Sequence, residues 1–174
     1  IEQLEKDWAE YPVIKISFGR SSYDSHETLL VILNSILSEH EKYFGIEKSS
    51  DNPSDRLNNL IQSIYEKTNK QVVILIDEYD KPILDALYTE YEEQNRQELR
   101  SFYSPLKDCD EYIRFLFITG ITKISHVNIF SGLNQLDDIS LEKAYATLCG
   151  ISESELEQYF EPEIKALAQE QEMT

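Results

Sequence analysis

Three short apolar segments of the chain predict strands, at residues 13–18, 72–76 and 112–118. The middle segment, Val-Val-Ile-Leu-Ile, is uniformly apolar and rich in β-branched side chains, which is typical of a strand buried on both faces of a parallel sheet. Longer segments with a helical spacing of apolar residues separate the three strands. We therefore expect an α/β fold with a parallel sheet and helices on both of its faces.

Two amphipathic helices are predicted between the first strand and the second. Apolar residues recur at intervals of three or four over residues 29–44 and again over residues 57–65. Asp24 and Glu27 form a capping-box pattern ahead of the first helix, and Gly45 would end it. The region before the middle strand is therefore expected to be helical apart from a polar connection.

Prolines and caps mark the later helices. Pro82 suits the first position of a helix that follows the middle strand. An apolar stripe over residues 99–106 would kink or end at Pro105, because proline lacks the backbone N–H that a helix interior needs. Ser152 and Glu155 form a second capping box, which predicts a terminal helix.

The junction after the middle strand carries the candidate chemistry. Asp77 and Glu78 follow the apolar run directly. In open α/β sheets ligands bind beyond the carboxyl ends of the strands, and P-loop ATPases hold Mg²⁺ there with an acidic residue. This pattern is typical of a Walker B strand, with Asp77 as the acid on the Mg²⁺ side and Glu78 as the group that polarises a water.

Two other interpretations of this junction stay open. The strand could end in a solvated acidic turn that needs no ligand, with Asp80 capping the helix that begins at Pro82. Alternatively, Asp77, Glu78 and Asp80 could be the ligands of a metal-dependent nuclease, because two-metal hydrolysis of phosphodiesters needs several acids near one point.

Composition narrows the classes of partner. The 174 residues carry a net charge of −17, which disfavours a broad nucleic-acid interface. An apolar content of 41% argues for a folded domain rather than an acidic tail. Cys109 and Cys149 lie too far apart for a C-x-x-C motif, and no apolar run approaches membrane-spanning length. The cytoplasm is the expected location, and because the chain starts with Ile1 and has Met173 as its only methionine, we expect a fragment of a longer protein.

Several segments, taken in order, resemble the bacterial AAA-ATPase-like proteins, which are P-loop ATPases often joined to a C-terminal nuclease-like domain of the PD-(D/E)xK type. The resemblance extends from about Trp8 to about Phe160. It implies an ATPase-like domain over residues 1–150 and the start of a helical extension over residues 151–174. The segments that carry the resemblance are residues 72–84, 99–110, 114–120, 130–134 and 145–150.

The resemblance also implies roles for individual residues. Asp77 would orient Mg²⁺ through its water shell, Glu78 would be the general base for the attacking water, and Thr119 would occupy the sensor position near the γ-phosphate. ATP and Mg²⁺ would then be the cofactors of the full-length protein. A nuclease-like domain would be a further part of that protein.

One element of the family is missing from the printed sequence. No Walker A loop, G-x-x-x-x-G-K-[ST], occurs in it, although that loop supplies the backbone N–H groups and the lysine that hold the phosphates. We therefore expect this chain alone to be inactive. The Walker A strand of such folds lies between the Walker B side of the sheet and its other strands. Without it, the strand at residues 112–118 is expected to lack its neighbour and to expose an apolar edge.

Overall fold

The computed structural model describes residues 9–19, 21–121, 129–130, 133, 135–148 and 150–170. The chain divides into two compact units, Ile1–Gln135 and Leu136–Thr174, and each is described by itself. The expected domain boundary at residue 150 stays a prediction. Cys149 and residues 131, 132 and 134 of the family-like segments lie outside the described residues.

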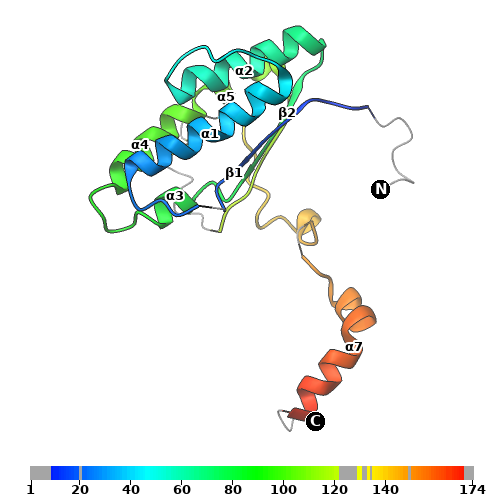
Figure 1. Ribbon diagram of the computed structural model, residues 1–174. Helices are drawn as coiled ribbons and strands as arrows, with labels where there is room; N and C mark the ends of the chain where they lie inside the picture. The colour runs from blue at the N-terminus through cyan, green and yellow to red at the C-terminus, as the bar shows by residue number, and fades with distance from the viewer. Residues whose placement is uncertain are drawn as a thin grey trace. The chain divides into compact units, whose positions relative to one another are not determined.

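A three-stranded parallel sheet forms the centre of the first unit (Figure 1). Its strands are β1 (Val13–Ser17), β2 (Val72–Asp77) and β3 (Ile113–Ile118), in the spatial order β1-β2-β3. All three strands lie where the apolar pattern predicted them. The fold class is therefore confirmed as α/β with a parallel sheet, an arrangement compatible with a P-loop-like fold.

The place of β3 in the sheet confirms one expectation. β2 pairs directly with β3, with Ile74 opposite Leu116 and Ile76 opposite Ile118. On its other side β3 has no partner strand among the described residues, because it is the edge of the order β1-β2-β3, as expected for the strand at residues 112–118. The backbone groups on that side of β3 are therefore left without a strand partner within the described part of the sheet, as is usual for an edge strand.

The helices follow the predicted spacing, with small changes at their ends. Ser25 rather than Asp24 is the N-cap of the first helix, since its side chain accepts from the Thr28 N–H at 3.1 Å. That helix ends at Gly45, whose φ of 64° is a left-handed conformation that suits glycine. The helices of the first unit are α1 (His26–Phe44), α2 (Pro53–Thr68), α3 (Lys81–Leu84), α4 (Glu92–Tyr103) and α5 (Pro105–Asp108), with a 3₁₀ turn η1 (Asp110–Tyr112) before β3.

The described helices α1, α2, α4 and α5 lie on one side of the sheet (Figure 1). Burial along β2 alternates accordingly: Ile74 and Ile76 are buried, whereas Val73 and Leu75 are only half-buried. The uniform burial expected from the apolar run is therefore wrong, because none of the described helices of the first unit covers the second face. On that face Phe115 of β3 remains 54% exposed.

A buried ion pair joins α1 to α2. The guanidinium of Arg56, 1% exposed, donates from Nε to Oε1 of Glu41 at 2.9 Å and from Nη2 to Oε2 at 2.6 Å. Nη2 also donates to the Ser38 hydroxyl at 2.9 Å, and Nη1 donates to the backbone and side-chain oxygens of Asn34. These bonds use every N–H of the guanidinium, which is the condition for burying it at an acceptable cost.

The second unit contains the 3₁₀ turn η2 (Lys143–Tyr145) and the helix α7 (Glu153–Glu170). The predicted capping box is confirmed, since the Ser152 N–H donates to the Glu155 carboxylate at 2.9 Å and the Glu155 N–H donates back to Oγ of Ser152 at 3.3 Å. The helix is kinked at Phe160, two residues before Pro162. Within the part of the chain that the structure describes, no helix is both long and apolar enough to cross a bilayer.

Candidate functional site

The carboxyl ends of the three strands meet at one edge of the sheet. Ser17 at the end of β1 lies opposite Asp77 at the end of β2, and the Phe18 N–H donates to the Asp77 carbonyl at 3.1 Å. On the other side, the Thr119 N–H donates to the Ile76 carbonyl at 2.8 Å. The residues that leave these strands are therefore held together by backbone hydrogen bonds.

Asp77 and Thr119 form a direct side-chain contact at this edge. The Thr119 hydroxyl donates to Oδ1 of Asp77 at 2.7 Å. Asp77 is exposed and Thr119 is half-buried, so the carboxylate faces solvent while the hydroxyl fixes its orientation. Two residues that lie 42 positions apart in the sequence, and that the strand pattern placed at a common edge, are thus brought together.

Glu78 adopts a conformation that few side chains tolerate. Its φ is +54°, in the left-handed region, which costs a non-glycine residue roughly 1–2 kcal/mol. The turn directs its carboxylate toward the end of β1, where a Cβ on Gly19 would lie only 2.7 Å from Oε1 of Glu78. The absence of a side chain at Gly19 is therefore what makes room for the Glu78 carboxylate.

Asp80 does not have the role that the sequence suggested. It precedes α3, which begins at Lys81 with Pro82 as its second residue, yet its side chain makes no capping bond to that helix. Its carboxylate is fully buried, and Oδ2 accepts from the Ile121 N–H at 2.9 Å. The prediction of a side-chain cap is wrong, because the carboxylate is turned toward the segment that follows β3.

The three acids therefore diverge. Asp77 contacts Thr119, Glu78 lies over Gly19, and Asp80 bonds to the Ile121 N–H. Among the described residues no group of three or more His, Cys, Asp or Glu side chains is placed to hold a metal ion. A single carboxylate nevertheless fits Mg²⁺, because that ion is commonly held by one or two carboxylates together with waters and substrate phosphates.

A basic side chain and a tyrosine near this edge were not anticipated from the sequence. Lys81 forms an ion pair with Asp85 at 3.0 Å, and Oδ2 of Asp85 also accepts from the Tyr23 N–H at 3.2 Å. The Tyr23 hydroxyl donates to the Phe18 carbonyl at 3.1 Å. Burial, helped by the nearby Asp85 carboxylate, raises the pKa of Tyr23 well above its usual value. The i, i+4 spacing of Lys81 and Asp85 was the available signal for the ion pair.

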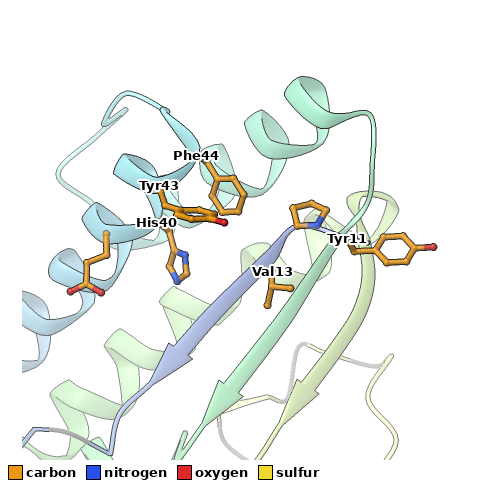
Figure 2. A pocket seen from close by; sticks show the side chains of 7 residues that line it. Tyr11, Val13, His40, Tyr43 and Phe44 are labelled. Atoms are coloured by element: carbon orange, nitrogen blue, oxygen red, sulfur yellow. The ribbon is translucent and has the colours of Figure 1, made fainter. Parts of the chain in front are cut away.

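A separate cavity of about 460 Å³ lies at the start of β1 (Figure 2). In Figure 2, His40, Tyr43 and Phe44 approach it from α1 and Val13 approaches it from β1. His40 Nε2 is 2.9 Å from the Lys15 carbonyl, so the imidazole is engaged with the edge strand. None of the residues predicted for the functional site lines this cavity.

Comparison with known proteins places the chain in a family. The family model described as "Predicted AAA-ATPase" matches residues 1–130. The chain is also 39% identical, over 163 residues, to the "Uncharacterized protein in vnfD 5'region" of Azotobacter chroococcum mcd 1. That alignment covers 92% of this chain and 32% of the relative, so the chain spans about a third of the relative's length. No solved structure matches the chain significantly.

Proposed function

Because the chain belongs to the predicted AAA-ATPase-like family, we propose that it is part of an ATPase that binds ATP and hydrolyses it with Mg²⁺ in the full-length protein. The observation that carries this proposal is the contact between the Thr119 hydroxyl and the Asp77 carboxylate, 2.7 Å apart at the carboxyl end of the central strand. Such an edge is where ligands of open parallel sheets bind. β2 would then be the Walker B strand.

Each of the three residues has a role in this proposal. Asp77 would hold Mg²⁺ through its water shell, with the Thr119 hydroxyl keeping the carboxylate in one orientation. Glu78, which is half-buried over Gly19, would accept the proton of the attacking water. Bound Mg²⁺ supplies neutralisation of the charge that builds up on the transferred phosphoryl group.

The phosphate-binding loop is the part that this chain does not supply. Since the printed sequence has no G-x-x-x-x-G-K-[ST], the proposal assigns phosphate binding to another segment of the full-length protein and makes the isolated chain inactive. A C-terminal nuclease-like domain is the further partner that we propose. The length of the relative leaves room for both a phosphate-binding segment and a nuclease-like domain, because this chain aligns with 32% of it. The proposed location is the cytoplasm, where ATP and Mg²⁺ are abundant.

The experiment that tests this function compares two variants of the full-length protein. Glu78→Gln should retain ATP binding and lose hydrolysis by about 10²-fold or more, because it removes the proton acceptor. Asp77→Ala should weaken the Mg²⁺-dependent part of ATP binding, measured with Mg²⁺ and with EDTA. Glu66→Gln, on the exposed surface of α2, is the matched control and should behave as the natural protein. Hydrolysis at the natural rate by both site variants would show the assigned roles to be wrong.

A second candidate function is a non-catalytic interaction module that keeps the ATPase fold. It is favoured by the lack of a G-x-x-x-x-G-K-[ST] motif in the printed sequence and by the position of the Glu78 carboxylate against Gly19. Equilibrium binding of a fluorescent ATP analogue to the full-length protein separates the two candidates. Saturable, Mg²⁺-dependent binding supports the ATPase, and no binding at millimolar nucleotide supports the interaction module.

The third candidate, a carboxylate nuclease, finds little support in the geometry, since the side chains of Asp77, Glu78 and Asp80 point to three different partners. It predicts Mg²⁺-dependent cleavage of DNA by the chain itself. Incubation of the 174-residue chain with plasmid DNA and Mg²⁺ tests that prediction, with intact plasmid as the expected result.

A further inference from the structure

The segment that follows β2 contacts the segment that follows β3 at three successive residues, Thr119, Gly120 and Ile121. The Tyr79 N–H donates to the Thr119 carbonyl at 3.1 Å, and Oδ2 of Asp80 accepts from the Ile121 N–H at 2.9 Å. Between these two bonds, Gly120 lies directly under the side chains of Tyr79 and Asp80. Thr119, the residue that contacts Asp77, is therefore the first residue of a segment held from the β2 side.

Gly120 shows how closely the two segments approach. A Cβ on this glycine would collide with the ring of Tyr79 and would lie 2.8 Å from Oδ1 of Asp80. Real Cβ atoms do not approach other heavy atoms so closely, so only glycine permits this arrangement. The close approach places the Asp80 carboxylate where it can receive the Ile121 N–H.

The Asp80 side chain contributes nothing to the start of α3. The first bonds of that helix run from the Ile83 and Leu84 N–H groups to the backbone carbonyl of Asp80, at 3.0 and 2.9 Å. The carboxylate makes no capping bond there. Burying a carboxylate is costly unless it accepts hydrogen bonds, and the Ile121 N–H supplies one such bond to Oδ2 of Asp80.

We propose that Asp80 is a positioning residue for the candidate site. Its buried carboxylate fixes the backbone at Ile121 and thereby sets the direction in which Thr119 presents its hydroxyl to Asp77. The functional significance of this role rests on the proposed ATPase function, because it matters for chemistry only if Asp77 is the acid on the Mg²⁺ side. The structural coupling of Asp80 to Asp77 through Ile121 and Thr119 can be measured without any nucleotide.

The test uses NMR of the isotopically labelled 174-residue chain. In Asp80→Ala, hydrogen exchange of the Ile121 amide should accelerate by about tenfold or more, since a hydrogen bond to a buried charged group is lost. The ¹³C shift of the Asp77 carboxyl should move toward its value in Thr119→Val, which lacks the donor hydroxyl. Asp80→Asn keeps a side-chain oxygen that can accept the bond and should stay close to the natural spectrum.

Two further variants separate positioning from general destabilisation. Leu33→Ala removes buried side-chain volume from α1 and should lower stability while leaving the Asp77 and Thr119 signals unchanged. Gly120→Ala keeps every site side chain but forces Tyr79 and Asp80 apart from the β3 segment, so it should reproduce the shifts of Asp80→Ala. If Asp80→Ala does not fold, the comparison of Asp80→Asn with Gly120→Ala carries the test.

The outcomes distinguish this proposal from the ATPase assignment. The positioning role would be overturned if Asp80→Ala or Gly120→Ala left the Ile121 exchange rate and the Asp77 chemical shift unchanged. It would also be overturned if Leu33→Ala shifted the Asp77 signal as much as they do. In the full-length protein, Asp80→Ala should lower kcat for ATP hydrolysis more than it raises KM, and Asp80→Asn should recover most of the loss. Coupled shifts in a protein that binds no ATP would support the positioning of Thr119 and refute the ATPase function alone.

Discussion

Removing Glu41 should be among the most damaging single changes to the fold. Arg56 is 1% exposed, and two of its N–H groups donate to the Glu41 carboxylate at 2.9 and 2.6 Å. In Glu41→Ala the guanidinium stays buried with Asn34 and Ser38 as its remaining partners, so its charge is uncompensated. Breaking a buried ion pair in this way costs about 3–5 kcal/mol, a large part of the roughly 5–15 kcal/mol that stabilises a typical domain.

Urea unfolding followed by circular dichroism measures this cost. With an m-value of roughly 2 kcal/mol/M, a loss of that size lowers the midpoint by about 2 M. Glu47→Ala, at an exposed position just after α1, is the control and should change stability by no more than about 0.5 kcal/mol. Replacing both partners, Arg56→Met with Glu41→Leu, should cost less than Glu41→Ala alone, because no buried charge is left unpaired.

The result that would refute this reasoning is specific. A loss below about 1 kcal/mol in Glu41→Ala would mean that the pair behaves as a surface salt bridge. A double replacement whose cost equals the sum of the two single ones would mean that Arg56 and Glu41 act independently, since coupled partners give a non-additive cycle.

Three further predictions concern other parts of the first unit. In a background without native cysteines, Leu75→Cys with Phe117→Cys should oxidise to an intramolecular disulfide, because these residues are partners on adjacent strands. Lys15→Cys with Phe117→Cys, two strands apart, is the control and should not cross-link. If the Leu75 and Phe117 pair does not cross-link, β2 and β3 are not neighbours. Burial raises the pKa of the Cys109 thiol. With the other native cysteine replaced, Cys109 should therefore react slowly with Ellman's reagent at pH 8 in the folded protein and rapidly in urea. Fast reaction in the folded protein would contradict the burial of this thiol. Tyr103→Phe should change the free energy of unfolding by less than about 1 kcal/mol, because the Tyr103 hydroxyl is buried without a hydrogen-bond partner among the described residues. A loss above about 2 kcal/mol in urea unfolding would reveal a hydrogen bond to that hydroxyl.

The strands, and the placement of Asp77 and Thr119 at one edge of the sheet, could be predicted because they depend on local patterns. Short β-branched apolar runs form strands in most contexts, and residues that leave parallel strands emerge at one edge whatever the loops between them do. The burial of β2 could not be predicted in the same way. An apolar run does not reveal how many layers cover it, and in this chain the described helices leave Val73 and Leu75 half-buried.

The features that the sequence did not predict depend on partners distant along the chain. Arg56 is a charged residue within an amphipathic helix, where solvent exposure is the ordinary expectation, and its burial follows from Glu41 on the preceding helix. Asp80 sits two residues before Pro82, where an N-cap is the ordinary expectation, and the partner of its side chain, the Ile121 N–H, lies 41 residues away. In both cases local propensity suggested one role and a tertiary contact determined another.

The two acids of the candidate site differ in how far the fold has already oriented them. Asp77 is exposed at the sheet edge and held by the Thr119 hydroxyl, so its orientation is set by the chain itself. Glu78 is directed onto Gly19 by a left-handed turn, a conformation that stores strain of a kind often found at functional sites. A general base must reach the proton that it removes, so the position of the half-buried Glu78 carboxylate matters for the proposed chemistry, whereas the Asp77 carboxylate is already exposed. Completion of the site by a phosphate-binding segment would therefore affect the position of Glu78 more than that of Asp77. Glu78→Gln is the variant that most directly separates an ATPase from a binding module that keeps only the ATPase fold.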